Sequence, residues 1–164
     1  MGDAGRHRHP GPRPSRWSAA KKGGAYAQAL GRSRGGFGTK LHVCVDALGL
    51  PVRLITGPGQ QNDMAAACDL IEGLPAPNVL ADKAYDADRL FNLVIEQGGD
   101  PVVPPKRNRK RQHAYDKALY KERNRVERFF SRIKQCRRIA TRYDKLAETF
   151  MGFVKLACIM VWLR

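Results

Sequence analysis

Residues 37–104 alternate between patterns typical of strands and patterns typical of helices, and this alternation limits the fold more than any other feature of the chain. Every second residue of segment 41–45 is apolar, and a short turn at 47–49 leads into a second apolar run at 52–55. A period of two indicates a strand with two different faces, and the short turn indicates that the two runs pair as a β-hairpin.

A helix is expected to follow the hairpin. Asn62 or Asp63 can cap its first turn, and the helix should continue to about Glu72. Gly73 and Pro75 mark its end, because glycine commonly follows a helix and proline cannot continue one.

A second round of strand and helix follows. A short apolar strand is expected at 78–81, and Asp86 can cap a helix that is stopped by Gly98. Another short strand is expected at 102–103. The order strand, helix, strand, helix, strand predicts the α/β class, with a mixed sheet flanked by helices.

The two ends of the chain differ in composition. Residues 1–36 are rich in glycine, proline and arginine, and we expect them to be disordered because they cannot bury enough apolar area. Residues 37–164 are expected to form one folded domain. The apolar run at 150–163 contains Lys155 and is shorter than the roughly 20 residues that span a bilayer, so it predicts a buried terminal helix and no membrane segment.

The chain carries a formal net charge of +15, from 30 lysines and arginines against 15 aspartates and glutamates. Such an excess attracts polyanions and favours nucleic acid as the partner. The alternative is that the charge serves solubility alone. Four scattered cysteines, without zinc-site spacing, indicate reduced thiols in a cytosolic protein.

Five of the six residues at 106–111 are cationic, and they include Lys106, Arg107 and Arg109. Like charges repel one another, so this run is expected to be an exposed loop that becomes ordered on an anion. The alternative is a solvated linker. Its position favours the anion, because the run leads directly into a helix with an unusual polar face.

That face consists of Tyr120, Arg123, Glu127 and Lys134, which fall within an arc of about 60° on an α-helix. It would hold a carboxylate between two cations and a phenol. The neighbouring stripe is apolar and has helical spacing, which predicts that it anchors the helix to the core. The stripe consists of Val126, Phe129, Phe130 and Ile133.

Asp82 is the second candidate for chemistry, because it ends an apolar strand and the carboxyl ends of strands are where sites gather in open α/β sheets. With Glu127 it would supply the carboxylate oxygens that Mg²⁺ or Mn²⁺ requires. Two bound metal ions can promote phosphodiester cleavage. The alternatives are that Asp82 is a turn or cap residue and that Glu127 forms a surface ion pair.

Three segments together resemble the DDE transposases of bacterial insertion sequences, specifically the insertion-sequence-five group within the insertion-sequence-four-like transposase domain. They are 31–42, 81–86, and the Tyr120, Arg123, Glu127 and Lys134 set with the residues 138–145 that follow it. The resemblance implies a ribonuclease-H-like mixed sheet, incomplete here at its N-terminal strand. It also implies metal-dependent DNA cleavage and strand transfer at terminal inverted repeats, a homodimer, and a cytoplasmic, nucleoid-associated bacterial protein.

By resemblance, Asp82 matches the second acid of the family's catalytic triad and Glu127 the third. Tyr120, Arg123 and Lys134 match the positions that contact DNA near the active site. One departure is Ala84, where the family usually has glycine.

The first acid of the triad has no counterpart, because residues 1–10 do not have the composition of a strand. Neither Asp3 nor Asp46 fits its place. We therefore hypothesise that the chain is a downstream reading frame or truncated copy of a transposase. Two functions remain open: a transposase or its C-terminal portion, and a catalytically inactive DNA-binding remnant or regulator. A basic RNA-binding protein fits the charge alone.

Overall fold

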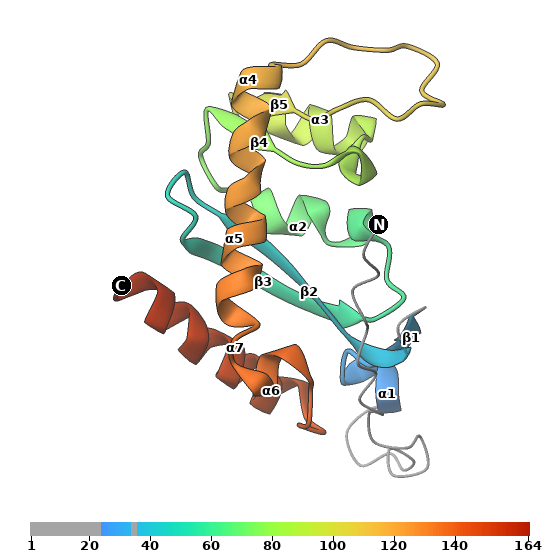
Figure 1. Ribbon diagram of the computed structural model, residues 1–164. Coiled ribbons are helices and arrows are strands. Elements are labelled where there is room, and N and C mark those ends of the chain that lie inside the picture. Colours follow the sequence, from blue (N-terminus) through green and yellow to red (C-terminus); the bar gives the residue numbers. More distant parts are fainter. Residues whose placement is uncertain (1–23, 34–35) are drawn as a thin grey trace, which may run out of the picture.

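The structure is a computed structural model that describes residues 24–33 and 36–164 (Figure 1). Its helices and strands are α1 Gly24–Ala27, β1 Gly31–Ser33, β2 Gly36–Val45, β3 Pro51–Pro58, α2 Ala67–Ile71, β4 Asn78–Leu80, α3 Asp88–Glu96, β5 Asp100–Val102, α4 Lys117–Tyr120, α5 Asn124–Ile133, α6 Arg137–Ala140 and α7 Ala147–Trp162. Short 3-10 helices are η2 Asp63–Ala65, η3 Lys83–Tyr85 and η4 Lys121–Arg123. The α/β class is confirmed.

The predicted hairpin forms the centre of the first sheet. Residues 39–44 of β2 pair antiparallel with residues 53–58 of β3. Asp46 stabilises the turn between them, because its Oδ1 accepts hydrogen bonds from the backbone N–H groups of Leu48 and Leu50, both at 2.9 Å. A short side chain that bonds to the backbone of the following residues is a common way to hold such a turn.

The strands form two separate sheets instead of the one mixed sheet that we expected. The first is antiparallel, in the order β1-β2-β3, and the second is a parallel pair of β4 and β5. Within residues 24–33 and 36–164, no strand pairing joins β2 to β4. Antiparallel and parallel pairing are therefore both present, but the described chain has no strand that would join the two sheets into one.

Strand β2 lies between two apolar clusters. Leu41 and Val43 pack on one side against a cluster from α5 and α7 that includes Phe129 and Val154. Cys44 packs on the other side against a cluster from α2 and α3. The alternation in the sequence therefore corresponds to a strand with both faces covered by helices, and α5 and α7 lie on one side of the hairpin in Figure 1.

The predicted helix with the apolar stripe is present, but it is not one continuous α-helix. The 3-10 turn η4 separates α4 from α5. Phe129 and Ile133 are buried, and Val126 and Phe130 are half-buried. The prediction that this stripe anchors the helix to the core is confirmed for α5.

The helix predicted after the hairpin is also confirmed, with a break. Asn62 caps η2, because its side-chain oxygen accepts a hydrogen bond from the Met64 N–H at 3.0 Å. The chain then continues into α2, which ends shortly before Gly73. That glycine has φ +68°, a left-handed conformation that costs glycine little.

The prediction that Asp86 caps the next helix is wrong. Helix α3 has Ala87 at its N-cap position, with no side-chain hydrogen bond. Asp86 is buried and accepts its hydrogen bonds from the basic loop instead. Unpaired cations close in space compete with a helix N-terminus for a carboxylate, and they form the stronger, charge-assisted bonds.

The expectation that residues 1–36 are disordered is wrong for 24–33, which form α1 and β1. Strand β1 pairs with the start of β2, and Leu30 is buried. Backbone pairing and burial together offset the entropy of ordering, which composition alone did not reveal. The rest of this expectation concerns residues 1–23 and 34–35, which lie outside the described residues.

The terminal run forms α7, as predicted. Phe150, Val154 and Val161 on this helix are buried, whereas Ile159 and Met160 are exposed. The helix thus packs with one side and leaves apolar side chains on the other. None of the helices in the described ranges is long and apolar enough to cross a membrane.

His42 on β2 gives a testable pH dependence. Its side chain is 3 % exposed, and Nε2 has no hydrogen-bond partner among the described residues. Burial, together with the charge of Lys40, lowers the pKa of His42, although Asp63 acts in the opposite direction. The unfolded chain therefore binds more protons than the folded one below about pH 6.5, and the free energy of unfolding should fall as the pH drops through this range.

Urea unfolding at about pH 7.5 and pH 5.5 measures this effect. We expect His42→Gln to reduce the difference in free energy between the two pH values. The control is His113→Gln, which retains His42 and should keep the difference. An equal pH dependence in wild type and His42→Gln would contradict the assignment.

Candidate active site

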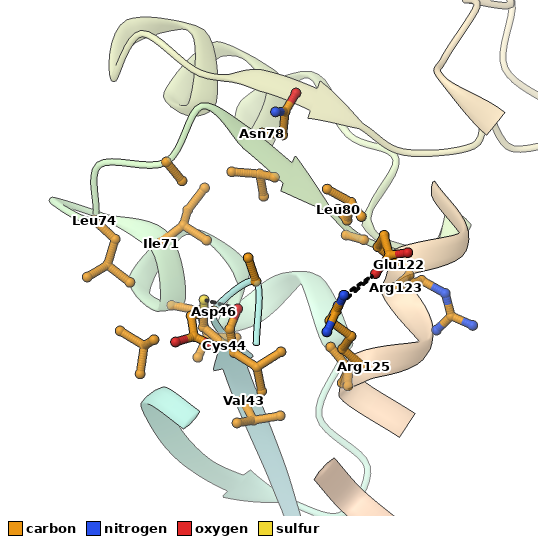
Figure 2. Close-up of a pocket in the computed structure, with 18 of the residues that line it drawn as sticks. Val43, Cys44, Asp46, Ile71, Leu74, Asn78, Leu80, Glu122, Arg123 and Arg125 are labelled. Atoms are coloured by element: carbon orange, nitrogen blue, oxygen red, sulfur yellow. Dashed lines mark hydrogen bonds and ion pairs between the residues drawn. The ribbon is translucent and has the colours of Figure 1, made fainter. Parts of the chain in front are cut away.

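A cavity of about 920 Å³ lies between the two sheets. Its walls come from β2, α2, β4 and the segment from α4 to α5, and Figure 2 shows side chains from these elements around it. Most of the wall is apolar, with contributions from Val43, Ile71 and Leu80. Asp82 and Glu127 also line it. A large apolar cavity with a few converging polar groups is the best candidate for a functional site.

Asp82 follows β4 and caps the short helix η3. Its Oδ1 accepts a hydrogen bond from the backbone N–H of Ala84 at 2.7 Å. The interpretation of Asp82 as a cap residue is therefore confirmed, and it is compatible with metal binding because the cap occupies one oxygen of a carboxylate that has two. Ala84 is not among the residues with positive φ, so alanine replaces the family's usual glycine without backbone strain.

Glu127 forms an ion pair with Arg123 one helical turn earlier. The Glu127 Oε1 atom lies 2.6 Å from Nη2 of Arg123, and the Glu127 side chain is 58 % exposed. The alternative interpretation as a surface ion pair is confirmed as well. An exposed i,i+4 pair contributes about 0.3–0.5 kcal/mol, which is too little for the pair to be essential to folding.

The Arg123 guanidinium is electrostatically coupled to both candidate acids. Burial lowers its pKa, but the hydrogen bond with Glu127 and the charges of Tyr120, Glu127 and Asp82 raise it, and the net pKa lies above the ordinary value. Arg123, Asp82 and Glu127 all line the same cavity. Arg123 therefore pairs directly with Glu127 and also experiences the negative charge of Asp82.

The predicted helix face is assembled in part. The Arg123 guanidinium lies over the Tyr120 ring, 5.7 Å from its centroid, so Tyr120, Arg123 and Glu127 form a chain of contacts. Lys134 follows α5 at its C-cap and is exposed, with Nζ 5.9 Å from the Phe130 ring centroid. It does not line the cavity. Three of the four predicted residues thus lie together, and the fourth extends the face along the helix.

Tyr85 is a cavity residue that the sequence analysis did not single out. Burial, followed by the charges of Asp63 and Asp82, raises the pKa of Tyr85 to about 12. Its hydroxyl therefore remains protonated at neutral pH and can donate a hydrogen bond. Its place three residues after Asp82, in a short helix capped by that aspartate, is the signal that could have identified it.

The basic run is held against the protein by two aspartates. The Lys106 N–H donates to Oδ2 of Asp86 at 2.7 Å, and Arg109 pairs with Oδ1 of Asp86 at 2.7 Å and also with Asp88. Lys106 and Arg109 are half-buried, whereas Arg107 is exposed. The expectation of a wholly exposed loop is confirmed for Arg107 and wrong for Lys106 and Arg109. The counter-charge that the sequence analysis missed is Asp86.

The candidate metal donors on this cavity are Asp82 and Glu127, the two of its four lining carboxylates that the family resemblance singles out. In the described part of the chain, no three histidine, cysteine, aspartate or glutamate side chains are grouped closely enough to hold a metal ion. Mg²⁺ commonly binds through one or two carboxylates together with substrate phosphates and water. Two carboxylates are therefore enough for one such ion together with phosphate and water, and too few for a cage around two ions.

Residues 3–162 match the sequence profile of the Transposase DDE domain family. The chain belongs to this family of transposases. The predicted resemblance is thereby confirmed, and members of the family generally use divalent metal ions.

Two relatives show the extent of the similarity. This transposase-family chain is 45 % identical over 130 residues to the transposase assigned to insertion sequence element IS6501 of Brucella ovis, covering 77 % of the chain and 98 % of the relative. It is 29 % identical over 136 residues to the transposase assigned to IS402 of Burkholderia cepacia, covering 76 % of the chain and 62 % of the relative. No solved structure matches this DDE-domain chain significantly.

In this transposase domain, the role of Asp82 as a helix cap can be tested separately from its negative charge. Asp82→Ala removes the acceptor for the Ala84 N–H and should lower the free energy of unfolding by about 1 kcal/mol. Asp82→Asn keeps a side-chain oxygen that can accept this hydrogen bond, so it should cost clearly less. Urea unfolding of both variants measures the difference, and equal losses would contradict the role of Asp82 as a cap.

Proposed function

We propose that this chain binds the terminal inverted repeats of a bacterial insertion sequence and acts as a DNA transposase, or as its C-terminal portion, in metal-dependent DNA cleavage and strand transfer. The observation that carries the proposal is the joint position of Asp82 and Glu127 on one cavity, which Arg123 also lines while it pairs with Glu127. Four carboxylates line this cavity, and Asp82 and Glu127 are the two that match the family's acids.

The acids have a defined role in this proposal. When bound, a divalent ion such as Mg²⁺ or Mn²⁺ would act as a Lewis acid on the scissile phosphate and activate the attacking oxygen. Asp82 and Glu127 would hold it, and binding of a cation beside Glu127 would free Arg123 from its ion pair. Arg123 can then bind a phosphate oxygen of the DNA, for which its planar donor group is well suited.

The cations outside the cavity provide the surface for the DNA backbone. Exposed basic side chains run along and beyond α5, including Lys121, Arg128, Arg132, Lys134, Arg137 and Arg138. Arg107 adds an exposed cation from the basic run, with Lys106 and Arg109 held beside it. We propose that Tyr120, Arg123 and Lys134 contact DNA near the acids and that these other cations fix its register. Binding to DNA would place the chain at the bacterial nucleoid, and one protomer at each inverted repeat would form the homodimer.

The second candidate is a catalytically inactive DNA-binding remnant or regulator. The specific observation in its favour is that no group of three or more histidine, cysteine, aspartate or glutamate side chains in the described residues could hold a metal ion. Both functions require DNA binding that weakens with salt. They differ in the effect of metal, because an inactive remnant has no use for an ion between Asp82 and Glu127.

The two candidates can be distinguished by DNA binding with and without Mn²⁺. The probe is a labelled duplex that carries the inverted repeats flanking the gene. If the acids hold an ion that also contacts phosphate, Mn²⁺ should tighten binding by about tenfold or more in wild type, which corresponds to about 1.4 kcal/mol. Asp82→Asn and Glu127→Gln should lose this increase while they still bind in the absence of metal.

Glu122→Gln is the matched control. Glu122 lies on the same helical segment, lines the same cavity and forms a similar ion pair, with Oε2 2.6 Å from Nη2 of Arg125. It should retain the full effect of Mn²⁺ because it is not one of the proposed metal ligands. If Mn²⁺ has no effect on wild type, or the same effect on all three variants, the catalytic proposal is wrong and the binding remnant is favoured.

A further inference from the structure

The chain between β5 and α4 is a long loop without helix or strand, which can be followed in Figure 1. Loops of more than about 12 residues in a compact domain are usually either functional or disordered. Residues 106–113 of this loop contain five lysines and arginines, and we refer to them as the basic arm. The contacts of the basic arm show which of the two cases applies.

The inner side of the basic arm is bound to Asp86, whose side chain is only 1 % exposed. One carboxylate oxygen accepts the Lys106 N–H at 2.7 Å, and the other accepts Nη1 of Arg109 at 2.7 Å. The backbone carbonyl of Asp86 also accepts Nζ of Lys106 at 3.0 Å. Charge-assisted bonds to a buried carboxylate are strong, and breaking them would leave a buried charge unpaired. Asp86 therefore holds the arm at two points.

Further contacts stabilise the shape of the arm. The Arg109 guanidinium lies over the Phe91 ring of α3, 5.2 Å from its centroid. The same ring meets the His113 ring edge-on, with 5.1 Å between the centroids. Within the arm, Nε2 of Gln112 donates to the carbonyl oxygens of Lys106 and Arg109, both at 3.0 Å. These contacts within the chain fix the arm, whereas the sequence suggested a loop that an anion would order.

The outer side of the arm carries three exposed cations, Arg107, Lys110 and Arg111. None of them forms an ion pair with an acid in the part of the chain that the structure describes. Arginine and lysine side chains bind phosphate oxygens through charge-assisted hydrogen bonds. Cations on a loop that already has its shape also lose less conformational entropy when they bind. The arm therefore presents a preformed surface for an anion with several phosphates.

A single short helix connects the arm to the candidate active site. Asp82 is the N-cap of η3, and Asp86 is the C-cap of the same helix. The Asp86 N–H closes this turn by donating to the Lys83 carbonyl at 3.3 Å. One end of η3 thus carries a candidate metal donor and the other end carries the residue that binds the arm. The arm is consequently held at a fixed place relative to Asp82.

We propose that Asp86 is a positioning residue for DNA, which holds the basic arm in a preformed shape that binds backbone phosphates beside Asp82. The side chains that bind these phosphates are Arg107, Lys110 and Arg111. Contacts with phosphates set the register of a protein on a duplex, so the arm would help to place the DNA relative to the candidate acids. The identity of the partner as DNA rests on the proposed function, whereas the fixed shape of the arm does not. The proposal has an unusual consequence, because it makes a carboxylate strengthen the binding of a polyanion.

The sign of the effect of Asp86→Asn on DNA binding tests this role. The substitution removes a negative charge, so electrostatics alone predicts tighter binding. It also puts an amide in place of one accepting oxygen, so the arm should be released and the affinity should fall by about tenfold or more. The dependence of log affinity on log salt should become less steep by about two to three, since each lost phosphate contact removes about 0.9. The measurement is the anisotropy of a labelled random-sequence duplex at several salt concentrations.

Glu96→Gln is the matched control. Glu96 is exposed on α3, and its substitution removes the same charge away from the arm. This variant should bind DNA at least as tightly as the wild type, with an unchanged salt dependence. Equal or tighter binding by Asp86→Asn as well would overturn the positioning role.

A double-mutant cycle separates positioning from a general effect on the fold. The arm-neutral variant combines Arg107→Gln, Lys110→Gln and Arg111→Gln, and it should bind DNA more weakly than the wild type. If Asp86 acts through these cations, adding Asp86→Asn to the arm-neutral variant should cause little further loss, because the two changes remove the same contacts. A further loss as large as that in the wild-type background would show that Asp86 acts through the fold, and it would overturn the proposal.

Amide exchange on the wild-type chain tests the preformed arm even if Asp86→Asn fails to fold. The Lys106 N–H donates to Asp86, and the Arg109 N–H donates to the Lys106 carbonyl at 3.0 Å. Without DNA, both amides should exchange at least about tenfold more slowly than amides of an unstructured chain. Exchange at the unstructured rate until DNA is added would show that the DNA orders the arm, and it would overturn the proposal.

The binding measurements also distinguish this inference from the proposed function. If the wild type binds DNA in a salt-dependent way and Asp86→Asn binds it equally well, the positioning role is wrong and the proposed DNA binding stands. If the wild type does not bind duplex DNA, the proposed function fails and the positioning role fails with it. Weaker binding and a reduced salt dependence in Asp86→Asn alone, with Glu96→Gln unaffected, is the result that supports both.

Discussion

The fold depends on β2, a strand that has an apolar cluster packed on each of its two faces. Leu41 and Val43 contact the cluster of α5 and α7, and Cys44 contacts the cluster of α2 and α3. Because side chains alternate along a strand, a shift of one residue in the register with β3 would exchange the two faces. The turn at Asp46 and the pairing with β3 hold that register, and they thereby position every helix that lines the cavity.

Arg123 is the cation nearest in charge to the acids of the candidate site. Glu127 pairs with Arg123, and Asp82 lies close enough to raise the pKa of the same guanidinium. The basic run shows the same principle, since Asp86 is buried and holds Lys106 and Arg109. A chain with an excess of cations keeps its few buried or clustered carboxylates paired, because an isolated charge away from water is costly. The pair of Arg123 and Glu127 is also the contact that DNA phosphate or a divalent ion would exchange.

Much of the fold was predictable because local chemistry specified it. The hairpin, the strands β4 and β5 and the apolar stripe of α5 followed from periodicity and turn residues, and all are present. The predictions that were wrong concern charges and long-range pairing. Asp86 has the sequence context of a cap, but it is bound by a loop 20 residues later. Segment 24–33 has the composition of a disordered region, but β1 pairs with β2.

The sequence by itself determined the family and predicted the two acids, because Asp82 and Glu127 are picked out by spacing within short motifs whose chemistry is local. Only the tertiary structure showed that both acids line one cavity with Arg123 and Tyr85. It also decided that the strands lie in two sheets, with open edges on β2 and β4 that line this same cavity. The physical reason is that strand pairing is a non-local interaction: a pattern of apolar residues specifies a strand, but its neighbours depend on which other strands are present to complete its hydrogen bonds.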